Sequence, residues 1–228
     1  MSTFSDYNTQ LEMKIANTSE TFFDSGTKVQ AVNDAIIEIL DNYDIPEMIK
    51  RDEITFVSGI KAKPDDYFRM VKLWDIDANG VETSIFNYLE TDKFDKLAAN
   101  SAYWWTEDYV IADGARELKV LPTDTTTIQI RYVKTPGTVD AAGLTDSNLS
   151  SKWDEVVALV AAKRLFQIAT RWDEAREFER LAREAMVRVY QAVKNPGGFK
   201  QGVRLKSKWD RVSLLGGFKA GSYDNYNN

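Results

Sequence analysis

Apolar residues recur every three or four positions in a segment near the N-terminus, which predicts an amphipathic helix. The helix is expected to begin after Thr27 and to end before Pro46. Its apolar stripe consists of Val29, Val32, Ala35, Ile36, Ile39, Leu40 and Tyr43. Such a stripe faces a protein core. Residues 1–26 are polar with scattered apolar positions, and they are expected to form an arm or a short helix.

Alternation with a period of two residues takes over in the middle of the chain and predicts strands. Residues 68–76 and 81–87 flank Asn79-Gly80, the dipeptide most typical of a two-residue hairpin turn. Another strand is expected over residues 103–111. Residues 118–120 and 128–132 are expected to form a second hairpin around Pro122. About six strands of this kind indicate a compact antiparallel sheet or sandwich.

A linker at residues 137–151 precedes the longest periodic block, which predicts two helices meeting near Thr170. Asp173 is the expected N-cap of the second helix, and Asn195-Pro196 ends it. The apolar face of the first helix consists of Trp153, Val156, Val157, Val160, Leu165, Ile168 and Ala169. That of the second consists of Trp172, Ala175, Phe178, Leu181, Ala182, Ala185, Met186 and Val189.

This order of elements predicts an α+β fold. We expect a helical core, made by the N-terminal helix and the C-terminal helix pair, with an inserted antiparallel β-sheet or sandwich and an extended C-terminal tail. The expected domains are 1–50 (N-terminal arm and core helix), 51–137 (β-rich insertion), 138–195 (linker and helix pair completing the core) and 196–228 (an extended tail that binds a partner).

Composition removes most catalytic chemistry from consideration. The 228 residues include no His and no Cys, which excludes a Ser-His-Asp triad, thiolate nucleophiles and zinc–thiolate sites. No apolar run is long enough to span a membrane, and the N-terminus has neither a basic leader nor an apolar core of a signal peptide. We therefore expect a soluble protein made in a cytoplasm, with no catalytic residue, no cofactor, no metal site and no membrane contact.

The net charge of −6 hides an asymmetry between the body of the chain and its C-terminus. Residues 197–228 carry six basic and two acidic side chains, a charge of +4, so the other 196 residues carry −10. An acidic body with a basic, aromatic tail suits contact with an acidic partner. The expected partner-binding residues are Lys200, Arg204, Lys206, Lys208, Trp209, Arg211, Phe218, Lys219, Tyr223 and Tyr226. The alternative is a terminus that only solubilises the protein.

Three weaker signals each have an ordinary structural explanation. Asp75, Asp77, Asn79 and Gly80 match the opening of an EF-hand loop, but its twelfth position is Phe86, so a hairpin turn is favoured. The neighbouring carboxylates of a possible hydrolase or two-metal site are Asp65 with Asp66, Glu107 with Asp108, and Glu177 with Glu179. In an acidic protein these are expected on a solvated surface. The aromatic run Tyr103, Trp104, Trp105 and Tyr109 is a core or subunit interface rather than a platform for bases, because its neighbouring charges are acidic.

One stretch allows the chain to be compared with a known family. Tyr109 and Gly114 precede a short strand ending at Pro122 and a second strand ending in Arg131-Tyr132-x-Lys134-x-Pro136, and an apolar helix led by Trp153 follows. This order resembles the head-to-tail connector adaptor proteins of tailed bacteriophages, over about residues 28–194. The tail is longer and more basic than the usual pattern, and Thr170-Arg171-Trp172-Asp173 stands where many relatives carry a Gly-Asp junction.

The resemblance implies a structural virion protein, without enzymatic activity, at the head–tail interface. Its subunits would form an oligomeric ring of twelve copies that joins the portal protein to a tail or nozzle protein. The ring would line the genome channel and pass double-stranded DNA without binding it specifically. Two alternatives remain: a nucleic-acid-binding module that uses the basic aromatic tail, and a hydrolase or metal enzyme based on carboxylates.

Overall fold

The computed structural model describes residues 1–16, 23–76, 81–109, 116–124 and 127–194. The chain has the predicted α+β fold and divides into two compact units, each made of two stretches of sequence. One, here called the β unit, comprises Met1–Asp6 and Asp44–Ser151. The other, the helical unit, comprises Tyr7–Tyr43 and the chain from Lys152 onward. The β-rich segment is inserted between the two stretches that form the helical unit, as expected for a helical core with an inserted sheet.

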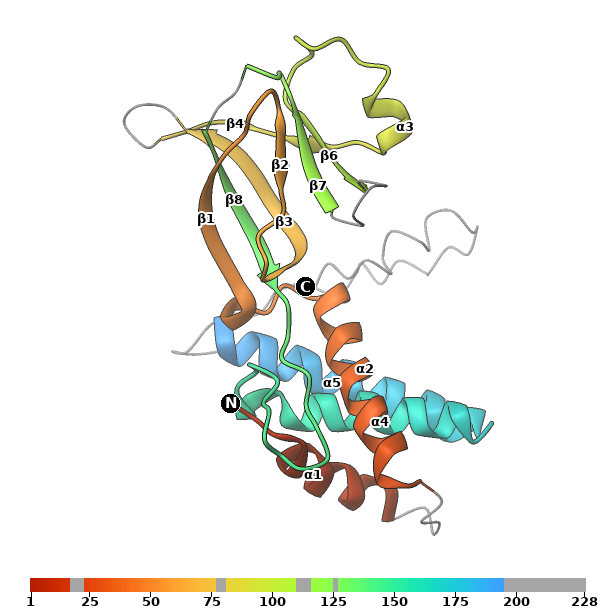
Figure 1. Cartoon of the computed structure of the whole chain (residues 1–228). Helices are drawn as coiled ribbons and strands as arrows, with labels where there is room; N and C mark the ends of the chain where they lie inside the picture. The colour runs from red at the N-terminus through yellow and green to blue at the C-terminus, as the bar shows by residue number, and fades with distance from the viewer. Residues whose placement is uncertain (17–22, 77–80, 110–115, 125–126, 195–228) are drawn as a thin grey trace, which may run out of the picture. The chain divides into compact units, whose positions relative to one another are not determined.

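Figure 1 shows the described helices of the helical unit. They are α1 (Phe4–Ala16, whose first residues belong to the β unit), α2 (Ser25–Asn42), α4 (Asp154–Ile168) and α5 (Trp172–Lys194). The helix predicted after Thr27 is α2, and it begins slightly earlier because Asp24 caps it. The Asp24 carboxylate accepts the Thr27 N–H at 2.7 Å, which satisfies one of the unpaired donors of the first turn. Most of the predicted apolar stripe is buried, namely Val32, Ala35, Ile36, Ile39 and Leu40, whereas Val29 and the C-cap residue Tyr43 are only partly buried.

The two C-terminal helices meet at Thr170, as predicted, where φ is 58°. The Arg171 N–H donates to the Phe166 carbonyl at 2.8 Å and closes the turn. Phe166 then stacks on Phe178 of α5, with ring centroids 5.2 Å apart. Asp173 is the second residue of α5, so its predicted position as N-cap is wrong.

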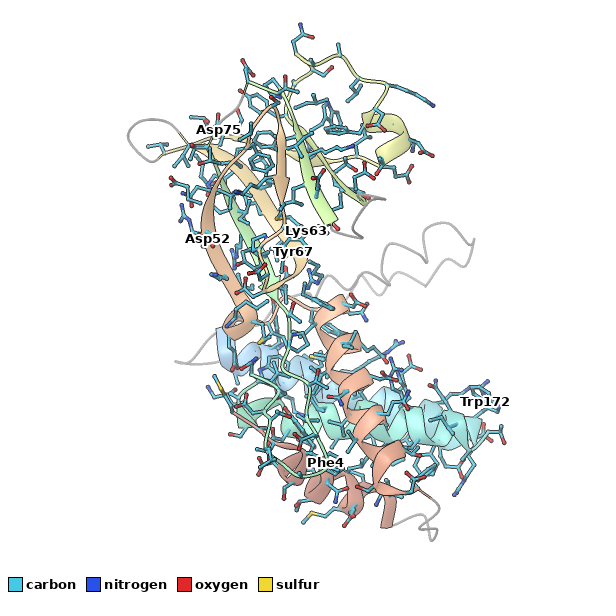
Figure 2. The ribbon with its side chains drawn as sticks, in the orientation of Figure 1. Phe4, Asp52, Lys63, Tyr67, Asp75 and Trp172 are labelled. Carbon is cyan, nitrogen blue, oxygen red and sulfur yellow. The ribbon has the colours of Figure 1, made fainter. Side chains whose placement is uncertain are left out.

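The predicted apolar faces of this pair are also wrong at the turn. Ile168 and Trp172 are 64% and 57% exposed, because the last turn of α4 and the first of α5 extend beyond the packed part of the helices. Figure 2 shows Trp172 projecting at this end. Ala169 is exposed as well.

The β unit consists of two four-stranded sheets (Figure 1). The first has the order β1-β8-β3-β4, and the second has the order β2-β7-β6-β5. The bounds are β1 (Ile49–Thr55), β2 (Ile60–Ala62), β3 (Tyr67–Ile76), β4 (Glu82–Ile85), β5 (Asn87–Tyr88), β6 (Trp104–Tyr109), β7 (Arg116–Leu121) and β8 (Thr127–Lys134). Short helical segments are η1 (Pro46–Met48), α3 (Thr91–Phe94) and η2 (Ser151–Trp153). All pairs are antiparallel except β5 with β6.

One predicted hairpin is present and the other is not. Strands β3 and β4 pair antiparallel, with Trp74 opposite Ile85, while the Asn79-Gly80 turn lies outside the described residues. Strands β7 and β8 belong to different sheets, so the hairpin predicted around Pro122 is wrong. The alternation correctly predicted which side chains are buried, because both strands turn every second side chain toward the same core. Period-two alternation identifies the buried face of a strand but not its partner.

That core lies between the sheets. It comprises Ile54, Phe56, Leu73, Phe86, Leu118, Val120, Ile128, Ile130 and Tyr132, with Tyr67, Met70, Tyr103 and Trp105 packed against it. Fully burying one such side chain stabilises a fold by about 1.5–3 kcal/mol. The sheets are therefore held together chiefly by apolar packing.

The segment expected to be a linker is a packed loop of the β unit. Val139 and Leu149 are 1% and 0% exposed, and the Ser2 N–H donates to the Leu149 carbonyl at 3.1 Å. The Ser147 N–H in turn donates to the Ser2 carbonyl at 3.1 Å. The first residues of the chain thus hold this loop through backbone hydrogen bonds.

Candidate functional site

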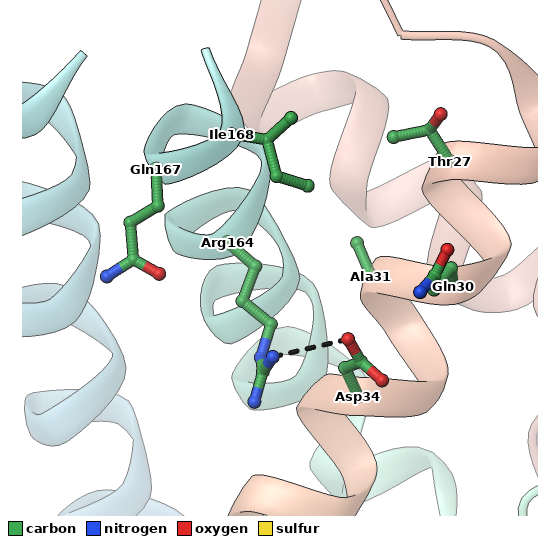
Figure 3. A pocket seen from close by; sticks show the side chains of 7 residues that line it. All are labelled: Thr27, Gln30, Ala31, Asp34, Arg164, Gln167 and Ile168. Carbon is green, nitrogen blue, oxygen red and sulfur yellow. Dashed lines mark hydrogen bonds and ion pairs between the residues drawn. The ribbon is translucent and has the colours of Figure 1, made fainter. Parts of the chain in front are cut away.

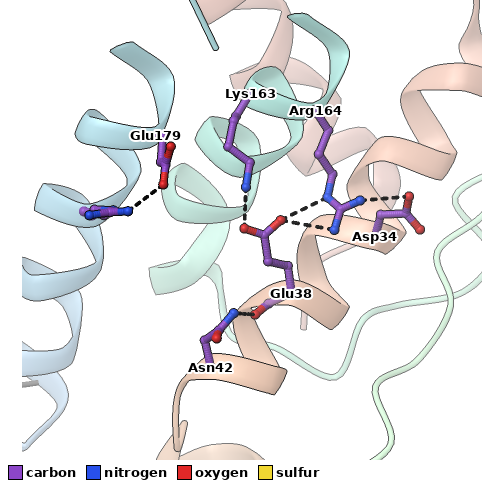
Figure 4. A network of polar contacts seen from close by, with 7 residues as sticks. Asp34, Glu38, Asn42, Lys163, Arg164 and Glu179 are labelled. Carbon is purple, nitrogen blue, oxygen red and sulfur yellow. Dashed lines mark hydrogen bonds and ion pairs between the residues drawn. The ribbon is translucent and has the colours of Figure 1, made fainter. Parts of the chain in front are cut away.

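A network of charged side chains joins α2 to α4 in the helical unit (Figure 4). The Glu38 carboxylate accepts hydrogen bonds from Lys163 Nζ and, at 3.1 Å, from Arg164 Nε. Arg164 Nη1 also donates to Asp34 Oδ2 at 3.2 Å. Lys163 is only 9% exposed, so its ammonium depends on Glu38 for compensation. The network fixes the register of the two helices.

Replacing Glu38 with Ala is expected to lower the free energy of unfolding by about 2 kcal/mol, because it leaves the buried Lys163 ammonium without its carboxylate. The matched control is Glu12→Ala, which removes the exposed pair with Lys28 at 3.1 Å. Exposed pairs contribute little, so the control should cost about 0.5 kcal/mol or less. Urea denaturation measures both. Equal losses in the two variants would contradict the role assigned to Glu38.

A pocket lies beside this network, between α2 and the C-terminal part of α4 (Figure 3). Its volume is about 350 Å³. It is lined by Thr27, Gln30, Ala31, Asp34, Arg164, Gln167 and Ile168. The two charged groups in the lining, Asp34 and Arg164, neutralise each other. The Thr27 hydroxyl in the lining donates to Asp24 Oδ2 at 3.2 Å as part of the N-terminal cap of α2. The lining therefore suits the side chains of a protein partner better than it suits a reacting substrate.

The exposed side of α5 is covered by ion pairs within the helix. Arg180 contacts both Glu177 and Glu184 at 2.5 Å, and Arg183 contacts Glu179 at 2.6 Å. The hydrogen bond from Arg180 and its charge lower the pKa of the Glu177 carboxyl. These pairs make a solvated, charge-balanced face. Glu177 and Glu179 bind different arginines and do not converge on one site.

Two carboxylates of the β unit are held by a tyrosine and a lysine each. Glu107 accepts from Lys63 Nζ at 2.5 Å and from the Tyr67 hydroxyl, whose residue is labelled beside Lys63 in Figure 2. These contacts join β6 of one sheet to β3 of the other. Asp66 accepts from the Tyr132 hydroxyl at 2.6 Å and from Lys50 Nζ at 3.3 Å. Of these neighbouring carboxylates, Asp66 and Glu107 are thus held in separate contacts, and Asp108 pairs with Lys119 at 2.5 Å.

Burial and the hydrogen bond to Asp66 raise the pKa of Tyr132 to about 12. In the unfolded chain the pKa of a tyrosine is about 10. Below that pH the Tyr132 phenol is protonated in both states, and its contribution to the stability of the folded state is fully present. The stabilisation is then lost as the pH rises to about 12. We expect Tyr132→Phe to cost about 1.5 kcal/mol at neutral pH. The difference from the original protein should shrink above about pH 10.

Denaturant unfolding between neutral pH and pH 12 tests this expectation. Tyr103→Phe is the control, because the Tyr103 ring packs on Phe86 with centroids 5.3 Å apart. This variant also removes a phenolic hydroxyl but leaves the Tyr132–Asp66 hydrogen bond intact, so it measures the general cost of a Tyr→Phe change in this unit. A difference that stays constant across the whole pH range would contradict the assignment to the Tyr132 hydroxyl.

The structure describes some of the residues that the sequence predicted as sites and leaves others outside the described ranges. All ten predicted tail residues lie outside the described residues. Of the four residues that match the opening of an EF-hand loop, only Asp75 is described, and its carboxylate accepts the Ile76 N–H at 2.9 Å. Within the described ranges, no three His, Cys, Asp or Glu side chains are grouped to hold a metal ion. Tyr103 and Trp105 pack against the core, as expected for structural aromatics.

Sequence reasoning missed a row of three cations in the β unit. Arg51 on β1 lies opposite Arg131 on β8, which in turn lies opposite Lys72 on β3. These residues are far apart in the sequence, and only the strand register places them together. The alternation around Lys72 and Arg131 was visible, but the strand that contains Arg51 was not predicted, and no local signal predicts which strands neighbour one another.

Comparison with known proteins adds no relative: no protein-family model matches the sequence, and no curated protein matches it. Among the described helices, none is long and apolar enough to cross a membrane.

Proposed function

We propose that this chain is a structural virion protein, the subunit of an adaptor ring that joins the portal to the tail of a bacteriophage. In this role the ring contains twelve copies, lines the genome channel and lets double-stranded DNA pass. The subunit is made in the host cytoplasm and acts at the head–tail interface. Its function is to bind neighbouring proteins, and it has no catalytic step.

The observation that carries this proposal is the organisation of the chain. A helical unit is assembled from segments on both sides of a β-rich insertion, and α5 runs without interruption to Lys194, directly before the basic tail. The tail therefore starts from the helical unit. The adaptor family to which the sequence has a resemblance combines the same parts in the same order. A binding segment attached to a rigid helical base suits a protein that links two assemblies.

The contacts of the ionisable groups agree with a structural role. Glu38, Asp66 and Glu107 each have cationic or phenolic partners from neighbouring elements. Such groups hold helices and sheets together. A hydrolase or metal enzyme based on carboxylates needs them to converge around one cleft, and the carboxylates described here are distributed over separate contacts.

Co-sedimentation with purified portal rings tests the proposal. We expect the protein to migrate with the portal through a density gradient. An equal amount of duplex DNA should not carry it at physiological salt, because the acidic body repels phosphate groups. Tight, salt-sensitive binding to DNA together with no binding to portal would overturn the proposal in favour of a nucleic-acid-binding module.

A further inference from the structure

The outer face of the sheet β1-β8-β3-β4 carries a row of three cations. Ile130 and Tyr132 point into the core, so Arg131 between them points outward. The register places Arg51 and Lys72 on either side of Arg131. Because neighbouring strands are about 4.8 Å apart, the three side chains start within about 10 Å of one another.

The outer two cations are held in place. Arg51 Nε donates to Gln129 Oε1 at 3.0 Å, and the guanidinium lies 5.0 Å from the centroid of the Trp74 ring. Lys72 Nζ lies 4.9 Å from the same centroid and pairs with Glu82 at 2.5 Å. Trp74 is only 2% exposed beneath them. The two terminal nitrogens of Arg51 thus remain available for a bidentate contact.

The central cation has no such support. Arg131 is exposed, and its side chain makes no hydrogen bond or ion pair with any residue that the structure describes. Like charges directly opposite each other on a sheet are destabilising. Lys72 is paired with Glu82, but the opposed Arg51 and Arg131 repel each other and lower the stability of the isolated unit. An anion bound from outside would relieve that repulsion.

We propose that this row, Arg51–Arg131–Lys72, binds a carboxylate-bearing surface of a second copy of this chain. The β unit contains twenty acidic and twelve basic residues, a net charge of −8, so another copy presents many carboxylates. The same charge repels an approaching nucleic acid. Guanidinium groups match carboxylates in bidentate geometry. Ile85, 55% exposed and opposite Trp74 in the register, adds an apolar contact beside the row.

The sign of the charge also determines the symmetry of this contact. Two copies cannot join through the same cationic row, because a two-fold contact would place the rows against each other. The row of one copy must meet a different, acidic surface of the next. Contacts of this head-to-tail kind close into rings when the rotation allows. The inference rests on the proposed ring and names the surface that joins its subunits.

The test combines charge reversal with a cross-linker. p-Benzoylphenylalanine replaces Ile85, and copies labelled with nitrogen-14 and nitrogen-15 are mixed, both free and with portal rings. We expect cross-links between light and heavy copies, at peptides rich in Asp and Glu. Arg51→Glu with Arg131→Glu should reduce their yield at least about tenfold. Lys61→Glu with Lys96→Glu is the control, since it makes the same charge change at exposed positions of the same unit.

Thermal unfolding separates lost contact from lost folding. The Arg51→Glu/Arg131→Glu protein loses the Arg51–Gln129 hydrogen bond and again places like charges opposite each other, so it should unfold at a somewhat lower temperature than the control but still in one cooperative transition. Cross-linking of the two variants is compared at a temperature where both are folded. Undiminished cross-linking in this variant would overturn the inference, as would the absence of mixed light–heavy cross-links in the original protein.

Two further outcomes distinguish this inference from the proposed function. Portal binding without light–heavy cross-links would overturn the contact surface and leave the adaptor role standing. Cross-links without portal binding would support the surface and overturn the adaptor role. The remaining alternative is that the row binds nucleic acid, and fluorescence anisotropy with duplex DNA in about 50 mM salt tests it. Binding lost in Arg51→Glu/Arg131→Glu but kept in the control would make the row a nucleic-acid surface and overturn our assignment.

Discussion

Deleting residues 197–228 is expected to abolish attachment to the portal while the rest of the chain stays folded. The last helix ends at Lys194, and the buried apolar residues of the described chain end at Tyr190. The deletion therefore removes none of these core contacts. It does remove six basic residues and Trp209, the side chains suited to a protein interface. We expect affinity for the portal to fall by about 100-fold or more, which corresponds to about 3 kcal/mol.

Binding to portal rings and thermal unfolding should be measured on the same preparation. A matched control keeps the tail length and replaces Lys206, Lys208 and Arg211 with Gln. If charge steers the tail, this variant binds more slowly and with less dependence on salt. If the truncated protein binds the portal as well as the full chain does, the role assigned to the tail is wrong.

Replacing Gly137 with Ala is expected to destabilise the β unit by about 3 kcal/mol or more, the upper range for adding a methyl group to a packed site. A Cβ at this position would lie 1.9 Å from the carbonyl oxygen of Asp146. Because that oxygen belongs to the backbone, the loop that contains it must shift. Asp146 forms an isolated bridge with Thr3, so a shift would also disturb the first residues of the chain.

Gly143 in the same loop provides the control. It has a φ of +69°, but a Cβ there would meet no atom within 4 Å. Gly143→Ala should therefore cost only about 1 kcal/mol, for the left-handed backbone conformation. Chemical denaturation of both variants measures the difference. Similar losses would show that backbone conformation, and not the close approach to Asp146, decides the need for glycine at position 137.

Helices α2, α4 and α5 were predictable because each has a long apolar face. The stripe from Val29 to Tyr43 predicted α2, and the break near Thr170 was visible as a change of face between Leu165 and Ala175. The cap at Asp24 was missed because three small polar residues follow it, and any of them could precede the helix. The predicted burial of Ile168 and Trp172, at the ends of the apolar faces, was wrong because periodicity carries no information on where packing stops.

Strand pairing was less predictable for a physical reason. Leu118 and Ile128 are both fully buried, so alternation correctly assigned their faces, but the strands that contain them lie in different sheets. Strand β1, with the sequence IKRDEIT, was missed because its charged residues hide its one buried position, Ile54. The pairing of β1 with β8 is also what builds the cation row. That row therefore required the structure, whereas the basic tail was visible in composition alone.

Native mass spectrometry of the protein, alone and mixed with portal rings, tests the adaptor assignment most directly. It counts the copies bound to each ring. The account predicts that the full chain joins the portal as a closed set of copies, twelve if the family resemblance holds, and that no partly filled series predominates. Failure to associate under any ionic condition, or binding of single copies without closure, would contradict it.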